Sequence, residues 1–275
     1  MIDKKLDALR ERLRQLESVV VCYSGGLDSG FTLAVAHEQL GHHAVGLTAA
    51  GPALAPRERD DAIAFARQIG ADHEMVDAGE IGVADYVANG PDRCFHCKSA
   101  LYVAAERYRQ QRGFRHVING TNLDDLGDYR PGLEAAKRAN IVSPLVDVGF
   151  TKSEVREAAR LLGLRLWDKP AAACLASRIP YGTAVTSKRL SQIAGFEAEL
   201  RDLGFRVVRV RHHDTIARIE VGEDELAAMA DPTTRQRVHD AGKRYGFSYV
   251  TLDLGAYRVG SHNEVLDGRR LRTVT

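Results

Sequence analysis

The chain has 275 residues, enough for one large domain or two modest ones with their own cores. Its 38 basic residues nearly balance its 37 acidic ones, so the total charge predicts no general affinity for nucleic acid or anionic membranes. The amino terminus is charged, and no uncharged apolar stretch approaches the roughly 20 residues that span a bilayer, which predicts a cytoplasmic protein. In that compartment the four cysteines favour metal binding or chemistry over disulfides.

The first part of the chain alternates between helical and strand patterns. Leu6, Leu9, Leu13 and Leu16 recur on one stripe, which predicts an amphipathic helix over residues 2–17. Apolar runs predict strands at 18–23, 44–48, 73–76 and 116–120, with helices at 31–40 and 56–69. Strands that alternate with helices indicate βαβ units, so the expected fold class is α/β with a mostly parallel sheet covered on both faces.

The later part of the chain has a different order of elements. A capping box at Thr151 and Glu154 opens a helix that ends before Gly163, and residues 167–186 are expected to be irregular. The elements predicted after them are a helix near 187–203, β-rich runs at 205–212 and 215–221, a helix near 230–245 and a strand at 248–254. This order predicts a smaller α+β domain, so we place one domain at residues 1–170 and a second at 171–275.

The first predicted strand leads into a glycine-rich loop and then a helix, an arrangement that binds anions. The loop reads Ser24-Gly25-Gly26-Leu27-Asp28-Ser29. Its glycines allow backbone N–H groups to point inward, and the following helix adds its positive dipole end. Hydroxyls of Ser24 and Ser29 can donate to phosphate oxygens, and Asp28 can hold Mg²⁺ beside them. The alternative is an ordinary strand-to-helix turn, and the loop matches neither the Walker pattern nor the dinucleotide fingerprint.

This loop resembles the phosphate loop of the PP-loop ATPases, also called N-type ATP pyrophosphatases. Those enzymes transfer AMP to an oxygen of the substrate, release pyrophosphate, and let a nucleophile displace AMP. The resemblance implies that the protein uses ATP and Mg²⁺. It also implies that adenine is held at the end of the second predicted strand, around Thr48, although Thr48 can equally be an ordinary strand-end residue.

Further segments narrow the resemblance. They are Arg93-Cys94-Phe95-His96-Cys97-Lys98, the stretch 120–132 with Asp124-Asp125-Leu126-Gly127-Asp128, Cys174-Leu175-Ala176-Ser177-Arg178-Ile179-Pro180-Tyr181-Gly182, and the C-terminal Tyr257-Arg258-Val259-Gly260-Ser261. With the phosphate loop, they make essentially the whole chain similar to the LarE family of ATP-dependent sulfur transferases. That family thiolates a pyridinium dicarboxylate mononucleotide in making the nickel-pincer cofactor of lactate racemase. The resemblance implies a small-molecule mononucleotide substrate and a homo-oligomer.

The chemistry of sulfur transfer fits one cysteine in particular. A carboxylate accepts sulfur only after adenylation turns its oxygen into a leaving group, and a thiolate is a strong nucleophile for the second step. In the LarE pattern the residue that supplies sulfur matches Cys174, which has polar neighbours at Ser177 and Arg178. We therefore assign Cys174, Ser177, Arg178 and Asp28 to the catalytic site. In the sacrificial version of the reaction Cys174 gives up its own sulfur and becomes dehydroalanine; the structural alternative is a buried, inert cysteine.

Cys94 and Cys97 point to a second route for the sulfur. LarE-like proteins with this pair and the later cysteine are expected to hold a [4Fe-4S] cluster, so the resemblance implies Cys94, Cys97 and Cys174 as metal ligands with an extra sulfide on the open iron. A zinc site completed by His96 and a redox pair remain open as alternatives. Cys22 lies within the first predicted strand and is interpreted as a core residue.

Charged residues near predicted strand ends complete the expected site. Asp125 and Asp128 follow the fourth strand, at the edge where open α/β sheets bind ligands, so either can help hold Mg²⁺ unless the segment is only a solvated loop. Arg209 and Arg211 share one face of a later strand, and two exposed guanidiniums there can grip a phosphate or carboxylate. A solvated strand face is the alternative.

The two histidines that follow, His212 and His213, are interpreted as surface residues at a strand end.

Two other functions fit part of the pattern. A tRNA thiolase shares the ATP loop and the cysteine chemistry, but the near-neutral charge and the lack of an appended RNA-binding region count against a nucleic-acid partner. A non-catalytic nucleotide-binding regulator would bind ATP without releasing pyrophosphate, and it leaves Cys174 and its polar neighbours unexplained. The sequence therefore predicts an ATP-dependent sulfurtransferase.

Overall fold

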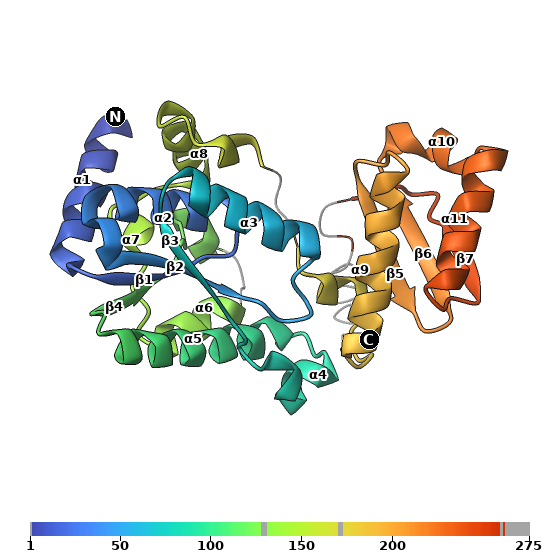
Figure 1. Cartoon of the computed structure of the whole chain (residues 1–275), viewed down its shortest axis with the longest axis horizontal. Coiled ribbons are helices and arrows are strands. Elements are labelled where there is room, and N and C mark those ends of the chain that lie inside the picture. The colour runs from blue at the N-terminus through green and yellow to red at the C-terminus, as the bar shows by residue number, and fades with distance from the viewer. Residues whose placement is uncertain (1, 128–130, 170–172, 259–260, 262–275) are drawn as a thin grey trace, which may run out of the picture. The chain divides into compact units, whose positions relative to one another are not determined.

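The computed structural model describes residues 2–127, 131–169, 173–258 and 261, and it divides into two compact units, Met1–Ala173 and Cys174–Thr275 (Figure 1). The domain boundary expected at residue 170 lies outside the described residues, as do Asp128 and residues 259–260 of the expected motifs. None of the helices in the described part of the chain combines the length and apolar character that crossing a bilayer requires.

The first unit is built on a parallel four-stranded sheet with the order β3-β2-β1-β4. Its strands are β1 (Val19–Cys22), β2 (Ala44–Ala49), β3 (Asp72–Val76) and β4 (His116–Ile118). Val19 lies opposite Ala44 on one side and His116 on the other. The chain leaves β1 towards β2 and β3 and later returns to the other side of β1, so the strand order reverses between β1 and β4. The expected parallel α/β sheet is confirmed.

Helices cover both faces of this sheet. They are α1 (Ile2–Leu16), α2 (Leu27–Leu40), α3 (Pro56–Gln68), α4 (Ala84–Ala88), α5 (Arg93–Arg112), α6 (Pro131–Arg138), α7 (Pro144–Asp147) and α8 (Lys152–Leu161). Figure 1 shows α5 and α6 on one side of the sheet and α2 and α8 on the other. The long helix α5, which carries the Cys94–Cys97 motif, was not expected from the sequence pattern.

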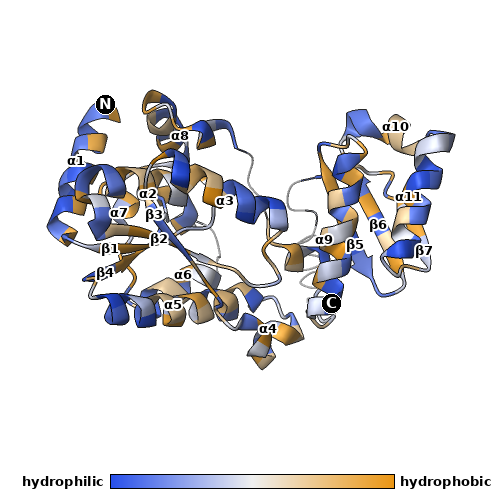
Figure 2. Cartoon of the chain, in the orientation of Figure 1, coloured by the Kyte–Doolittle hydropathy of each residue, from blue (hydrophilic) through white to orange (hydrophobic). Residues whose placement is uncertain are grey.

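The strand β1 is buried on both faces because its side chains alternate between two cores. Val19 and Val21 pack with residues of α1, α2 and α8, whereas Val20 and Cys22 pack with residues of α5 and α6. Figure 2 shows β1 and β2 in hydrophobic colours and the surface helix α1 mostly in hydrophilic ones. The two-sided burial explains why the sequence of β1 is continuously apolar, and it confirms Cys22 as a core residue.

The second unit is a three-stranded sheet with helices on one face. The chain order is α9 (Ser187–Asp202), β5 (Val208–His213), β6 (Ile216–Val221), α10 (Leu226–Ala230), α11 (Pro232–Arg244) and β7 (Tyr249–Leu252). β6 lies in the middle, antiparallel to β5 and parallel to β7. Glu197 of α9 accepts a hydrogen bond from the backbone N–H of Val210 at 3.1 Å, so this helix also covers part of the edge strand β5.

Candidate active site

The phosphate loop, residues 24–29, joins β1 to α2. Gly25 has φ +76°, and a Cβ at this position would lie 3.1 Å from the Cβ of Ala62 in α3. Gly26 is the N-cap of α2 and has no side chain. The N–H groups of the first helical turn therefore have no side-chain cap and remain available to a ligand. Those groups and the positive end of the helix dipole form an anion site at the carboxyl edge of the sheet.

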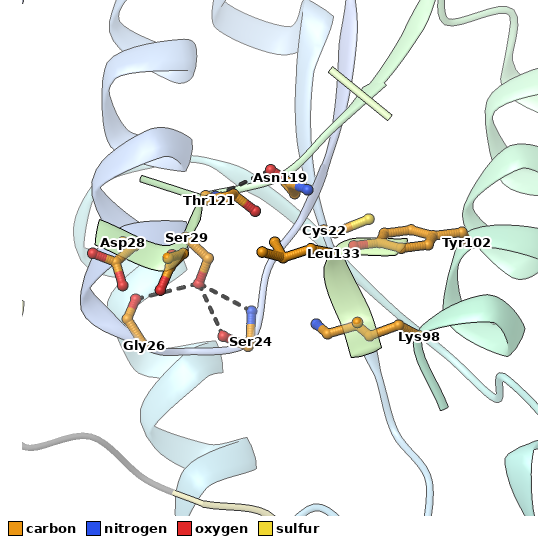
Figure 3. Close-up of a pocket in the computed structure, with 13 residues that line it drawn as sticks. Cys22, Ser24, Gly26, Asp28, Ser29, Lys98, Tyr102, Asn119, Thr121 and Leu133 are labelled. Atoms are coloured by element: carbon orange, nitrogen blue, oxygen red, sulfur yellow. Dashed lines mark hydrogen bonds between the residues drawn. The ribbon is translucent and has the colours of Figure 1, made fainter. Parts of the chain in front are cut away.

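The two serines of the loop play different parts, which Figure 3 shows. Ser29 is buried, and its hydroxyl donates to the carbonyl of Gly26 at 3.3 Å and accepts from the backbone N–H of Ser24 at 3.2 Å. The hydroxyls of Ser24 and Ser29 lie 3.1 Å apart. Ser29 therefore shapes the loop, whereas Ser24 is exposed and is the serine available to a phosphate.

Asp28 stands in the first turn of α2 and forms an ion pair with Lys152 through Oδ2. Its other oxygen, Oδ1, is buried and has no hydrogen-bond partner among the described residues. Asp125, whose Oδ2 accepts from the backbone N–H of Asn122 at 3.1 Å, lines the same pocket. Carboxylate oxygens are the ligands that Mg²⁺ prefers, so Asp28 and Asp125 fit a magnesium ion at this place.

A pocket of about 280 Å³ lies beside the phosphate loop. Its walls include Ser24 and Asp28 after β1, Asn119 and Thr121 after β4, and Tyr102 of α5 (Figure 3). It therefore sits between the strands where the sheet order reverses, which is where open α/β sheets bind ligands.

Gly120 allows the residues that follow β4, which form one wall of the pocket, to approach α2. A Cβ on this residue would lie 2.6 Å from the backbone nitrogen of Ser29 and 2.7 Å from the Cα of Ser29. No side chain fits at that distance without moving the backbone, so any larger residue would push β4 away from the first turn of α2. In the sequence Gly120 is only one residue of the 120–132 segment, and its role is visible only in the structure.

Lys98 is a site residue that the sequence reasoning did not single out. It lies on α5 and lines the pocket, and Figure 3 shows its ammonium extending towards the phosphate loop. Burial lowers the pKa of Lys98, but Tyr102 and the thiols of Cys22, Cys97 and Cys94 outweigh burial, and the net pKa is raised. The ammonium thus stays charged and suits the oxygens of a phosphate.

The pair Cys94 and Cys97 stands in the first two turns of α5, beside Lys98. Cys94 is exposed and Cys97 is half-buried, whereas burial raises the pKa of the Cys22 thiol to about 12. Cys94 and Cys97 have the donor chemistry of a cluster or zinc site. Within the described ranges, however, no three His, Cys, Asp or Glu side chains gather into a group that could hold a metal ion.

His96 lies beside two carboxylates of the first unit. Its Nε2 lies 3.1 Å from Oδ2 of Asp92, and its Nδ1 lies 3.9 Å from Oδ2 of Asp85. Both ring nitrogens thus face carboxylates on the surface of the first unit.

The side chain of Thr48 is not available to a base. Thr48 is 2% exposed, and its hydroxyl donates to the carbonyl of Tyr23 at 2.7 Å and lies 2.8 Å from Nε2 of His73. These bonds join β2 to the end of β1 and to β3. The sequence-based interpretation of Thr48 as a cofactor-binding side chain is therefore wrong for its hydroxyl.

In the second unit, Cys174 stands at the start of a short 3₁₀ helix, Leu175–Arg178, and is exposed. Its carbonyl accepts from the Ser177 hydroxyl at 2.8 Å and from Nη1 of Arg178 at 3.1 Å. Arg178 is buried and forms an ion pair with Glu197 of α9 at 2.9 Å. Ser177 and Arg178 thus hold the backbone of Cys174 and leave its thiol in the open.

The expected exposed pair of arginines is wrong for Arg211, which is 6% exposed. Arg211 makes two hydrogen bonds to Glu220, at 2.9 and 2.7 Å, and a third to the carbonyl of Ser177 at 3.0 Å. A buried guanidinium needs such partners, and Glu220 on the adjacent strand provides them. Arg211 therefore supports the segment that carries Cys174.

Arg209 has no direct salt bridge within the described part of the chain, although the carboxylate of Glu197 acts to raise its pKa. Its guanidinium lies 4.8 Å from the ring centre of Tyr257, and no carboxylate of the described residues forms an ion pair with it. Burial lowers the pKa of Arg209, and the nearby cation Arg178 lowers it further. An anion placed beside Arg209 would relieve both effects, so of the two arginines Arg209 is the one suited to bind substrate.

His212 is also placed differently from the expectation. It is 3% exposed, its ring lies 5.2 Å from that of Phe247, and its Nε2 lies 3.3 Å from Oε1 of Gln192. His212 shares the helix-covered face of β5 with Val208 and Val210, because strand side chains alternate. His213 is exposed, as expected for a strand end.

The sequence of this chain is similar to the sequences of several known proteins. Residues 3–106 match the family model described as asparagine synthase. An uncharacterised protein of Synechocystis sp. is 41% identical over 266 residues, or 97% of this chain and 99% of that protein. The pyridinium-3,5-bisthiocarboxylic acid mononucleotide synthase of Lactiplantibacillus plantarum is 36% identical over 262 residues, 95% of this chain and 94% of that enzyme. A tRNA-specific 2-thiouridylase MnmA of Rickettsia typhi is 27% identical over 231 residues, 66% of this chain and 64% of that enzyme.

Proposed function

The chain belongs to the LarE family of ATP-dependent sulfur transferases, a branch of the PP-loop enzymes, and from this membership we propose that it thiolates a pyridinium-3,5-dicarboxylate mononucleotide for the nickel-pincer cofactor. The observation that carries the proposal is that one chain holds both a phosphate loop with a pocket, in its first unit, and an exposed, backbone-anchored Cys174, in its second. ATP use follows from the family; the identity of the carboxylate substrate is the proposal.

In the first step, a carboxylate oxygen of the substrate attacks the α-phosphorus of ATP. A new O–P bond forms, the bond to the bridging oxygen of the β-phosphate breaks, and pyrophosphate leaves with that electron pair. The loop N–H groups and Lys98 would stabilise the charge that develops on the phosphates. Mg²⁺, held by Asp28 and Asp125, would neutralise the departing pyrophosphate.

In the second step, sulfur replaces AMP on the activated carbonyl. The thiolate of Cys174 attacks the carbonyl carbon and AMP leaves, so that a thioester joins protein and substrate. Loss of the Cα proton of Cys174 to a base then breaks its Cβ–Sγ bond, which yields the thiocarboxylate and a dehydroalanine. Arg209 would bind a phosphate or carboxylate of the substrate during this step.

A second source of sulfur is a [4Fe-4S] cluster held by Cys94, Cys97 and Cys174. Three thiolates would leave one iron open, and the cluster would supply an extra sulfide there. Two observations support this source: the Cys94–Cys97 pair is placed beside Lys98 of the nucleotide pocket, and Cys174 is exposed. The protein would then act in many turnovers rather than once.

The first test is the overall reaction. Purified protein with Mg·ATP and the dicarboxylate mononucleotide is expected to form AMP and pyrophosphate in equal amounts, and mass spectrometry should find a thiocarboxylate product. Ribonuclease treatment should leave the activity unchanged. Activity that disappears with ribonuclease would favour a tRNA thiolase, and ATP binding without pyrophosphate release would favour a regulator; either result would contradict the proposal.

The second test concerns the source of sulfur. If the cluster supplies the sulfur, protein purified without oxygen will contain near-stoichiometric iron and acid-labile sulfide and will lose both in Cys94→Ala, Cys97→Ala and Cys174→Ala. Cys22→Ala is the matched control, because this buried thiol in β1 should not affect the iron content. No iron or sulfide after attempted reconstitution would reject the cluster and favour the sacrificial route, in which Cys174 loses one sulfur atom per turnover.

A further inference from the structure

Glu80 is a buried carboxylate that the proposed chemistry does not use. It begins a short 3₁₀ helix, Glu80–Gly82, that follows β3, and the residue is only 4% exposed. Its Oε2 is buried without a hydrogen-bond partner, and within the described part of the chain Glu80 forms no ion pair. A carboxylate withdrawn from water without donors is costly to the fold, and such groups concentrate at functional sites.

The carboxylate of Glu80 lies against the loop that follows β2. A Cβ built on Gly51, in this loop, would be 1.7 Å from Oε1 of Glu80, so this position can only be glycine while Glu80 keeps its place. β2 and β3 end side by side, since Ala49 pairs with Val76 and the backbone N–H of Ala50 donates to the carbonyl of Val76 at 2.8 Å. Glu80 and Gly51 therefore occupy the same carboxyl edge of the sheet as the phosphate loop.

The segment that begins at Gly51 is followed by a helix that lies against the phosphate loop. It continues into α3, whose Glu58 carbonyl lies 3.5 Å from the position of a Cβ on Gly25. The backbone N–H of Tyr23, at the start of the phosphate loop, donates to the carbonyl of Leu47 in β2 at 2.9 Å. β3 is two strand spacings from β1, about 10 Å, so a ligand that is bound at the phosphate loop and extends over the end of β2 would come to the segment that follows β3.

We propose that Glu80 is a specificity-determining residue that recognises the adenosine part of ATP. The Glu80 carboxylate can only accept hydrogen bonds, and adenosine offers donors of two kinds: the ribose hydroxyls and the exocyclic amine of the base. Acidic residues that bind ribose hydroxyls at the edge of a parallel sheet are a general solution to nucleotide recognition. The phosphates would then lie at the loop and the nucleoside would reach across β2 to Glu80. This inference rests on the proposed use of ATP.

The test is the isosteric variant Glu80→Gln, with Asp77→Asn, an exposed carboxylate just after the same strand, as the matched control. Binding of ATP, 2′-deoxy-ATP and inosine triphosphate is measured directly, and thermal unfolding is followed without nucleotide. The variant should lose about 10- to 100-fold in ATP affinity, because a charged acceptor becomes neutral. Its unfolding temperature without nucleotide should be unchanged or higher, because a buried carboxyl group without a partner is replaced by an amide of the same shape.

Discrimination between the nucleotides identifies the group that Glu80 contacts. If wild type rejects 2′-deoxy-ATP and the variant does not, Glu80 accepts a hydrogen bond from the ribose hydroxyl. If wild type rejects inosine triphosphate and the variant does not, Glu80 accepts a hydrogen bond from the exocyclic amine of adenine. A variant that binds ATP like wild type, or one whose ATP affinity and unfolding temperature fall together without any change in discrimination, would overturn the inference. Binding is read without turnover, so protein that binds ATP but releases no pyrophosphate would contradict the proposed function and still report on Glu80.

Discussion

The variant Cys174→Ser is expected to form no thiocarboxylate while it still binds ATP and releases pyrophosphate. The structure predicts that sulfur transfer can be lost without loss of the earlier steps, because Ser177 and Arg178 bond to the carbonyl of Cys174 and not to its thiol. Serine should leave those bonds in place and remove only the sulfur. A hydroxyl is a far weaker nucleophile than a thiolate and carries no sulfur to transfer, so product formation should fall at least about a thousandfold.

Ser177→Ala is the matched control for this experiment. It removes one hydrogen bond to the carbonyl of Cys174 but leaves the thiol, so sulfur transfer should fall by about tenfold and not disappear. Single-turnover assays that follow pyrophosphate and thiocarboxylate in the same sample measure both effects. Normal product formation by Cys174→Ser would show that Cys174 neither supplies the sulfur nor holds its carrier.

The variant Asp28→Asn is expected to slow pyrophosphate release by about 100- to 1,000-fold and to raise the Mg²⁺ concentration needed for half-maximal rate. Asp28 has one oxygen paired with Lys152 and a second that is buried without a partner among the described residues. Asparagine keeps the shape but removes the charge that would hold Mg²⁺, and electrostatic stabilisation of a phosphoryl transition state is commonly worth several powers of ten.

Lys152→Met distinguishes this role from a structural one. It removes the partner of Asp28 on α8 but leaves the carboxylate in the phosphate loop, so a structural ion pair would make both variants fail alike. The expected result is a smaller loss for Lys152→Met, without a shift in the Mg²⁺ requirement. Equal pyrophosphate release by Asp28→Asn and wild type would reject Asp28 as the magnesium ligand.

The elements with strong local patterns could be predicted from the sequence. The continuous apolar run of β1 and the leucine stripe of α1 both appear in the fold within one or two residues of the expected bounds. α5 was missed because apolar and charged residues are spread around it, and it buries both Arg93 and Tyr102. Where a helix lacks one apolar face, its periodicity gives no signal even when the helix is long.

The pairing of charges could not be predicted in the same way. Arg209 and Arg211 are arginines at alternate positions of the same strand, and the sequence does not distinguish them. In the structure, Arg211 forms an ion pair with Glu220 and Arg209 does not. The burial of His212, in contrast, could have been predicted. If Arg209 and Arg211 share one face of β5, then His212 lies on the other face with Val208 and Val210, which the helices cover.

By itself, the sequence determined that the protein carries a phosphate loop after its first strand, a parallel α/β sheet and a cysteine in a polar segment, because each depends on neighbours along the chain. Only the tertiary structure decided which groups remain available for chemistry. Thr48 and Ser29 are already bonded within the fold, whereas Lys98, Gly120 and Glu80 gain their roles from neighbours distant in sequence. The physical reason is that availability depends on burial and on partners in space, and both are set by packing.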